Sequence, residues 1–410
     1  MPMPTSQPLP TPLPAFQPVP QPQLQPQPTP RQSVGTLGTH FAELEDPRVD
    51  RCKLHKLIDI VTIGICTVIC GGDDYPSMHA FGKAKQEWFE SFLELPHGIP
   101  SADTFWRVFG AIDPEQFQAC FLSWMQAISQ LSEGEIIAFD GKRLRHSYDK
   151  ASGKAAIHMV SAWATSNRLV LGQRKVDDKS NEITAIPELL RRLDIAGCLI
   201  TIDAMGCQAA IAAQIVEQEA DYLFSLKGNQ SHLHADVALL FKDLAESGYT
   251  AYDYQSEKHV DKDHGRIEVR HCWTLSDPQL IQALRNTDRF AGLQTLVRIR
   301  AERYLPGQEP ALEDRFFISS APLSAPHALH AVRTHWQIEN SLHWVLDIAF
   351  REDDSRIRTN NGPQNFAVLR HIALNALKQE SSVKLGIKNK RLKAGWDEDY
   401  LLKVLSHILI

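Results

Sequence analysis

The apolar residues between about 35 and 130 recur at the three- and four-residue spacing of helices. Two helices are predicted at about 54–70 and 77–95. A third is predicted to begin at Ser101, because serine is a good N-cap residue. Pro114 suits the first turn of a fourth helix. This part of the chain is therefore predicted to form a small all-helical domain.

From residue 135 onward, short β-branched runs alternate with helical ones. Three strands in a meander are predicted from EIIAFDG, AAIHMVSAWAT and RLVLGQRKV. They are followed by a helix at 182–193, a strand at CLITIDA, a helix at 208–219 and a strand at DYLFSLKG. The order strand, strand, strand, helix, strand, helix, strand is that of an RNase H-like α/β fold, by analogy of element order.

More strand-like material separates this core from its last helices. After a predicted helix at 232–244, strands are expected at RIEVRHCWTL, GLQTLVRIRAER and EDRFFISS. Helices are then predicted at 335–350 and 361–378. The pattern predicts an α/β domain over 131–380 with a β-rich insertion at about 231–325.

The two ends of the chain differ in composition from the rest. Residues 1–34 are rich in proline and glutamine and are expected to be disordered, because they can bury too little apolar surface to offset the entropy of ordering. Residues 381–410 are predicted to form a basic helical tail, with five Lys or Arg residues between Lys384 and Lys393.

Composition narrows the class of protein. The 410 residues are 43% hydrophobic and 22% charged, as in a soluble globular protein, and the net charge is −6. None of the seven cysteines forms a C-x-x-C pair, which favours reduced thiols over a zinc site. No apolar run is long enough to cross a membrane. We expect a cytoplasmic protein associated with the nucleoid.

Three acidic residues stand where strand or helix geometry would expose them. Asp140 and Asp203 each follow a predicted strand, and Glu339 borders the apolar stripe of a predicted helix. If the two strands are parallel neighbours, both aspartates project from one sheet edge. Each acid alone could equally be a turn, cap or surface residue. Together they suit two Mg²⁺ ions, or Mn²⁺, for phosphodiester chemistry.

Basic residues surround the first of these acids. Lys142, Arg143 and Arg145 follow Asp140 closely, where a phosphate would lie. Lys and Arg that neutralise phosphates supply sequence-independent affinity for DNA, although an ordinary charged loop has the same composition. The other candidate DNA contacts are Lys227, Asn229, Arg333, His335 and Arg356.

Two histidines flank Glu339 in the sequence. His335 and His343 could share a helix face, but no cysteine or third histidine joins them. We therefore do not expect a metal site built on imidazole. Packing or contact with DNA is the favoured role for both.

Five longer motifs occur along the sequence in this order: FDGKRLRHS, TIDAMGCQ, LKGNQ, HGRIEVR and HWQIENSLHWVLDIAFREDDSRIR. With the helical region at 46–125, they resemble the DDE transposases of bacterial insertion sequences. The resemblance is closest to the ISAs-type branch, which includes the H-repeat-associated proteins linked to Rhs elements. It covers nearly the whole chain after residue 35.

The resemblance implies a catalytic triad of Asp140, Asp203 and Glu339 that binds magnesium. It also implies an RNase H-like core with a β insertion, and double-stranded DNA as substrate at the element's ends and at a target. One signature differs. Related transposases carry Tyr, Arg, Glu and Lys around the last acid, but here His335 and Leu346 occupy the Arg and Lys positions.

We therefore expect a transposase that cleaves DNA strands and transfers the freed 3′ hydroxyl to target DNA, without a covalent protein intermediate. Two alternatives remain open. A metal-dependent nuclease on the same fold cuts without joining, and a catalytically silent remnant binds DNA only. A homo-oligomer on DNA is expected from the family, although the sequence shows no interface.

Overall fold

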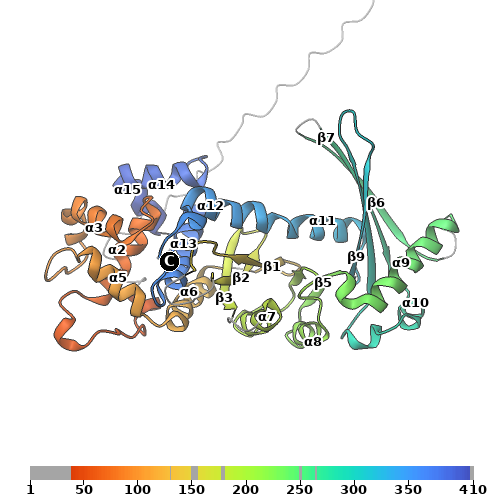
Figure 1. The fold of residues 1–410 in the computed structure, drawn as a ribbon, viewed down its shortest axis with the longest axis horizontal. Coiled ribbons are helices and arrows are strands. Elements are labelled where there is room, and N and C mark those ends of the chain that lie inside the picture. Colours follow the sequence, from red (N-terminus) through yellow and green to blue (C-terminus); the bar gives the residue numbers. More distant parts are fainter. Residues whose placement is uncertain are drawn as a thin grey trace, which may run out of the picture.

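The computed structural model describes residues 38–129, 131–148, 156–176, 181–248, 252–263 and 266–406. The predicted Pro/Gln-rich tail lies outside these residues. The molecule is elongated, with helices gathered at one end and long strands at the other (Figure 1). Among the described residues, no helix combines the length and apolar character that a membrane span requires.

The N-terminal part of the described chain is helical, as predicted. Ser101 and Asp113 cap their helices by accepting backbone N–H bonds, which explains where these two helices begin. The helix predicted at 77–95 is two helices instead, because the backbone leaves helical geometry at Lys85. The helices are α2 (Leu57–Ile69), α3 (Tyr75–Ala84), α4 (Gln86–Glu90), α5 (Ala102–Ala111) and α6 (Pro114–Ile128).

The sheet has the RNase H-like arrangement that the element order predicts. Its first five strands lie in the order β3-β2-β1-β4-β5, with β1 parallel to β4 and β4 parallel to β5. Strands β2 and β3 complete an antiparallel meander with β1. The strands are β1 (Ile136–Arg143), β2 (His158–Ala164), β3 (Leu169–Val176), β4 (Leu199–Ile202) and β5 (Asp221–Leu226).

Helices cover both faces of this core sheet. In Figure 1, α7 (Glu182–Leu190) and α8 (Ala209–Glu217) lie on one side of the strands, whereas α11 (Ala325–His335) and α12 (Trp344–Phe350) run along the other. The strands β1 and β4 are buried along the length of their pairing, as expected for parallel strands covered by helices.

The insertion extends the core sheet instead of forming a separate one. Strand β9 pairs antiparallel with β5, and β8, β7 and β6 follow it, so the whole sheet has nine strands. Three of these four strands were predicted, and β6 was not. The insertion contains α9 (Ser231–Glu246), β6 (Gln255–Asp263), β7 (Arg266–Leu275), α10 (Pro278–Ala283), β8 (Thr295–Tyr304) and β9 (Ala311–Ser319).

The helix predicted at 335–350 starts ten residues earlier and is not regular. Helix α11 begins at Ala325, where Ser324 caps it, and ends at His335. A π-helical turn, Glu339–His343, then separates it from α12. Such turns are rare and occur often at functional sites.

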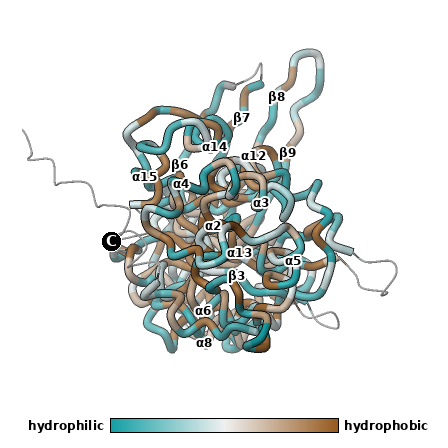
Figure 2. The backbone as a smooth tube through the Cα atoms, turned by 90° about the vertical axis from the view of Figure 1, so that its left-hand side faces the viewer, coloured by the Kyte–Doolittle hydropathy of each residue, from teal (hydrophilic) through white to brown (hydrophobic). Residues whose placement is uncertain are grey.

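The C-terminal segment packs into the helical end of the molecule. Helix α13 (Gly362–Gln379) is buried along almost its whole length and contacts α2, α5, α6 and β3. In Figure 2, hydrophobic stretches are concentrated around α2, α13 and β3. The helices α14 (Ile387–Trp396) and α15 (Glu398–Ser406) follow.

Two cations of the basic tail are buried instead of presented to solvent. Lys390 donates to the carbonyl oxygen of Leu377, and Arg391 donates to that of Val68 and to Asp73. Both side chains thereby satisfy backbone carbonyl groups at helix ends. These two residues contribute to the fold, whereas Lys384 and Lys388 of the same tail are exposed.

Asn375 joins α13 to strand β3. It is fully buried, accepts the N–H of Val170 (3.0 Å) and donates to the carbonyl oxygen of the same residue (2.9 Å). We expect Asn375→Ala to lower the free energy of unfolding by about 1–3 kcal/mol, because buried polar groups of β3 lose their partner. Urea denaturation measures this loss.

The exposed Asn389 on α14 provides the control. Asn389→Ala is expected to change the free energy of unfolding by less than about 0.5 kcal/mol. Equal effects of the two substitutions would show that Asn375 does not hold the strand.

Candidate active site

The pairing of β1 with β4 brings the two aspartates to the same level of the sheet. Phe139 is paired with Ile202, so the next residue on each strand is Asp140 or Asp203. Strand β4 ends at this point, whereas β1 continues to Arg143 alongside β2. Asp140 therefore lies within its strand, not at its end as the sequence suggested, but it lies where the pairing with β4 stops.

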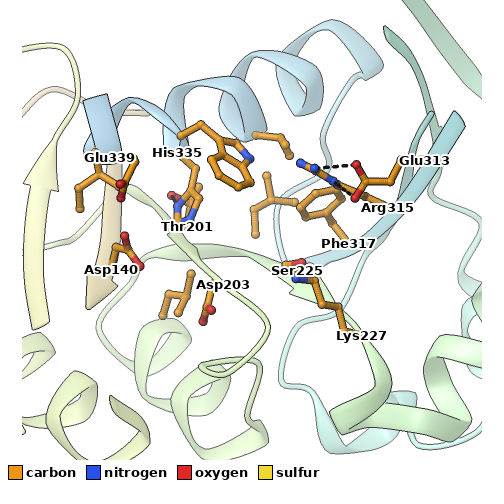
Figure 3. A pocket seen from close by; sticks show the side chains of 15 residues that line it. Asp140, Thr201, Asp203, Ser225, Lys227, Glu313, Arg315, Phe317, His335 and Glu339 are labelled. Atoms are coloured by element: carbon orange, nitrogen blue, oxygen red, sulfur yellow. Dashed lines mark hydrogen bonds and ion pairs between the residues drawn. The ribbon is translucent and has the colours of Figure 1, made fainter. Parts of the chain in front are cut away.

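The third acid, Glu339, approaches the two aspartates from the helix above the sheet (Figure 3). Asp140, Asp203 and Glu339 all line one cavity of about 250 Å³. Figure 3 shows Glu339 on the helix above the sheet, with Asp140 facing it and Asp203 farther along the same edge. The structure thus brings all three predicted acids to one cavity.

A histidine stands between two of these acids. The Nδ1 atom of His343 lies 3.1 Å from Glu339 Oε2 and 3.5 Å from Asp140 Oδ2. Asp140, Glu339 and His343 each offer a ligand atom, and these atoms lie within 4.8 Å of one another. We predicted no imidazole in the metal site, and the structure places one beside it.

Asp140 is costly to ionise in this site. Burial raises the pKa of Asp140 to about 7, the backbone N–H of Gly141 opposes the rise, and Glu182, Asp203 and Glu339 add to it by repulsion. Glu182 was not predicted to be near the site. Gly141 leaves room for it, because a Cβ atom there would overlap Glu182 and its partner His158.

Asp203 is oriented by the loop that follows it. Its Oδ1 atom accepts the backbone N–H groups of Met205 (2.9 Å) and Gly206 (3.3 Å). These bonds leave its second carboxylate oxygen for other partners, on the same cavity as Asp140 and Glu339. The loop residues AMG after the strand are therefore part of how the site is built.

Two lysines hold the π-helical turn that carries Glu339 and His343. Lys378 donates to the carbonyl oxygen of Ser341 (2.7 Å), and Lys142 donates to that of His343 (3.3 Å). A π-turn breaks the regular pattern of helix hydrogen bonds, so these donors satisfy carbonyl groups within it. Burial lowers the pKa of Lys378 to about 6.

Lys142 also anchors a buried ionic network. Its ammonium group lies 2.5 Å from Asp347 and 3.0 Å from Glu352, and Glu352 lies 3.5 Å from Arg370 on α13. The side chains of Glu352 and Arg370 are each only 2% exposed. Lys142 thus ties the strand of Asp140 to the helices behind Glu339, and its charge is already neutralised by carboxylates.

The remaining basic candidates have varied surroundings. Lys227 and His335 line the cavity of the acids. His335 is bonded to Thr201 (2.9 Å), and burial lowers its pKa to about 4. Arg333 pairs with Asp261 on β6 (3.0 Å).

The other candidates lie outside the cavity lining. Asn229 donates to the carbonyl oxygen of Ala204 (2.6 Å), which holds the loop after Asp203. Arg145 pairs with Asp353 while remaining mostly exposed. Arg143 and Arg356 are exposed.

The insertion contributes an arginine that sequence reasoning missed. Arg315 on β9 lines the same cavity, pairs with Glu313 (2.8 Å) and lies over the ring of Trp336 (5.3 Å). Strand β9 pairs with β5, and β5 pairs with β4, the strand that Asp203 follows. This order of strands places Arg315 at the cavity. No local sequence signal marks this residue.

Comparison with known proteins identifies relatives across most of the chain. Residues 131–376 match the family described as "Transposase DDE domain", and residues 38–125 match "DDE_Tnp_1-associated". YhhI of Escherichia coli K12, provisionally named an H repeat-associated transposase, is 40% identical over 90% of this chain and 97% of its own length. YbfL of the same strain is 41% identical over the same shares.

Among solved structures, a piggyBac transposase in a synaptic complex with hairpin DNA covers 88% of this chain and 75% of its own. The sequence identity is 10% and the TM-score is 0.41. This likeness is too distant to support a conclusion about activity.

Removing the charge of Lys142 should destabilise the protein strongly. We expect Lys142→Met to lower the free energy of unfolding by about 3–5 kcal/mol, because Glu352 is left buried with one cation fewer. Arg145→Met is the control, since an exposed ion pair contributes at most about 1 kcal/mol. Chemical denaturation distinguishes them, and a loss of under 1 kcal/mol for Lys142→Met would contradict the network.

Asp140 should make stability depend on pH. Its folded pKa of about 7 exceeds its ordinary value of 3.8. The folded chain therefore retains a proton that the unfolded chain releases, and the free energy of unfolding falls as pH rises from about 4 to 7. In the presence of a chelator, Asp140→Asn should be more stable than the wild type at pH 8, by about 1 kcal/mol or more.

The stabilisation by Asp140→Asn should be smaller at pH 5 than at pH 8, when both are measured by urea denaturation. The exposed Asp399 gives the matched control, and Asp399→Asn is expected to show the same small effect at both pH values. A pH-independent effect of Asp140→Asn would contradict the raised pKa.

Proposed function

The chain belongs to the family of the transposase DDE domain, and we propose that it cuts DNA at the ends of an insertion sequence and joins the freed 3′ hydroxyls to target DNA. The observation that carries this proposal is the meeting of Asp140, Asp203 and Glu339 at one cavity. These acids come from two strands and a late helix, more than 60 residues apart at the closest.

The donor set fits divalent metal ions. Three carboxylates line the cavity, and the imidazole of His343 lies beside two of them. The ligand atoms of Asp140, Glu339 and His343 lie within 4.8 Å of one another. Hard divalent cations take oxygen ligands, and two carboxylates per ion are enough when water completes the shell. Bound Mg²⁺ or Mn²⁺ would supply activation of water or a 3′ hydroxyl and stabilisation of the leaving oxygen.

The chain's own residues would hold and orient these groups. Asp140 lies level with Asp203 on the sheet and faces Glu339 across the cavity (Figure 3), so it would hold bound ions together with both acids. Backbone N–H bonds fix Asp203, and the π-helical turn with its two lysine donors fixes Glu339. Preorganised ligands of this kind avoid reorganisation during the reaction.

DNA would approach along the side of the cavity that Lys227 and Arg315 line, where Glu313 pairs with Arg315. Lys227 and Arg315 border the cavity on the side away from Glu339, as Figure 3 shows. Arg143 and Arg356 are exposed and remain proposed phosphate contacts. Lys142 is a positioning residue in this proposal, because it is committed to Asp347 and Glu352.

The acids of the triad should be needed for cutting but not for binding. With a plasmid that carries the gene and its native flanking DNA, we expect Asp140→Asn, Asp203→Asn and Glu339→Gln each to reduce cleavage more than about 100-fold, since outer-shell partners alone contribute 10–100-fold. Retention of the DNA in gel-shift assays should persist. Near-normal cutting by any one variant would remove that residue from the triad.

A joining assay separates a transposase from a nuclease on the same fold. Pre-cut ends with free 3′ hydroxyls are incubated with target plasmid, Mg²⁺ and the wild-type chain. Covalent joined products are expected, and the Glu339→Gln chain is the control that should give none. Cutting without any joining would favour the nuclease.

A further inference from the structure

We propose that His343 is a ligand of the ion held between Asp140 and Glu339, so that this position binds transition-metal ions such as Mn²⁺ or Co²⁺ in preference to Mg²⁺. The inference rests on the proposed function, because it concerns the same site. It adds a nitrogen ligand to a trio of acids and thereby specifies the class of cation.

The two distances from His343 to the acids suit neighbouring ligands of one ion, and all three ligand atoms lie within 4.8 Å of one another. Around an ion with bonds of about 2.1 Å, neighbouring ligand atoms lie about 3.0 Å apart in octahedral geometry and about 3.4 Å apart in tetrahedral geometry. Nδ1 of His343 lies 3.1 Å from Glu339 Oε2 and 3.5 Å from Asp140 Oδ2. The ring therefore already has the spacing of a ligand to both acids.

The ring is held in this position by burial and by its backbone. The side chain of His343 is 5% exposed, so it cannot swing into solvent. Lys142 donates to its carbonyl oxygen, and Lys378 donates to the carbonyl oxygen of Ser341 in the same turn. A ligand fixed in this way costs little conformational entropy when an ion binds.

Binding of an ion through the Nδ1 lone pair would place the ring proton on Nε2. Nε2 of His343 is buried and has no hydrogen-bond partner among the described residues. The bond to the ion would therefore have to offset the cost of a buried N–H group without an acceptor. The competing role is that Nδ1 carries the proton and donates it to Glu339, which would orient the acids without binding the ion.

The chemistry of the donors sets the preference among ions. Magnesium favours oxygen ligands and keeps much of its water, whereas imidazole suits later transition metals and raises their affinity relative to magnesium. Mn²⁺ accepts both kinds of donor. A site with two carboxylates and one imidazole should therefore bind Mn²⁺ and Co²⁺ more tightly than a site of carboxylates alone.

The test is pulsed electron paramagnetic resonance of the full chain loaded with Mn²⁺. We expect modulation from a directly bound ¹⁴N nucleus, and its replacement by a ¹⁵N pattern when the protein is made with ¹⁵N-labelled histidine. This comparison needs no substitution. His343→Asn should lose the nitrogen signal, whereas His335→Asn, which alters the histidine that lines the cavity, should retain it.

Calorimetry gives an independent readout. His343→Asn is expected to weaken Mn²⁺ binding by about 10-fold or more, the lower end of the effect of outer-shell partners, while Mg²⁺ binding changes less than about 3-fold. Equal losses for the two ions would overturn the ligand role in favour of the positioning role.

The possible failures are distinguishable. If the wild-type chain takes up Mn²⁺ but shows no histidine nitrogen coupling, the role of His343 is wrong and the carboxylate site of the proposed function stands. If the chain takes up neither Mn²⁺ nor Mg²⁺, the proposed function fails together with this inference.

Discussion

Three carboxylates that repel one another share one cavity, and much of the surrounding fold holds them there. Burial and the neighbouring acids raise the pKa of Asp140 to about 7, so its ionised form is disfavoured in the absence of an ion. Such a cost persists only where other parts of a structure compensate for it. The parallel pairing of β1 with β4 supplies part of that compensation, because it fixes Asp140 and Asp203 at the same level.

The helical end of the molecule also helps to hold the acids in place. Lys142 joins the strand of Asp140 to Glu352, and Glu352 lies beside Arg370 on the buried helix α13. Because α13 also contacts α2, α5 and α6, the N-terminal helices brace the site although none of them contributes an acid. At the other end of the molecule, the insertion is joined to the core sheet by the pairing of β5 with β9, and this pairing places Arg315 at the cavity.

The parts that the sequence predicted are those whose signals are local. Ser101 marks a helix start, and the β-branched runs before Asp140 and Asp203 mark strands, because caps and periodicity depend on a few adjacent residues. Strand β6 was missed because QSEKHVDKD has no apolar alternation and depends on pairing with β7. The pairing of Lys142 with Asp347 and Glu352 was not predicted, because these partners lie more than 200 residues away in the sequence. The π-helical turn that aligns His343 with Glu339 has no recognised sequence pattern.

We propose that Asp140, Asp203 and Glu339 bind divalent ions at one place. The most direct measurement is an anomalous difference map from a crystal of the chain soaked in Mn²⁺. A peak is expected at bonding distance from the carboxylates of Asp140 and Glu339, in the cavity that Asp203 also lines. A well-ordered, empty cavity at saturating Mn²⁺, or a peak only at other acids, would contradict it.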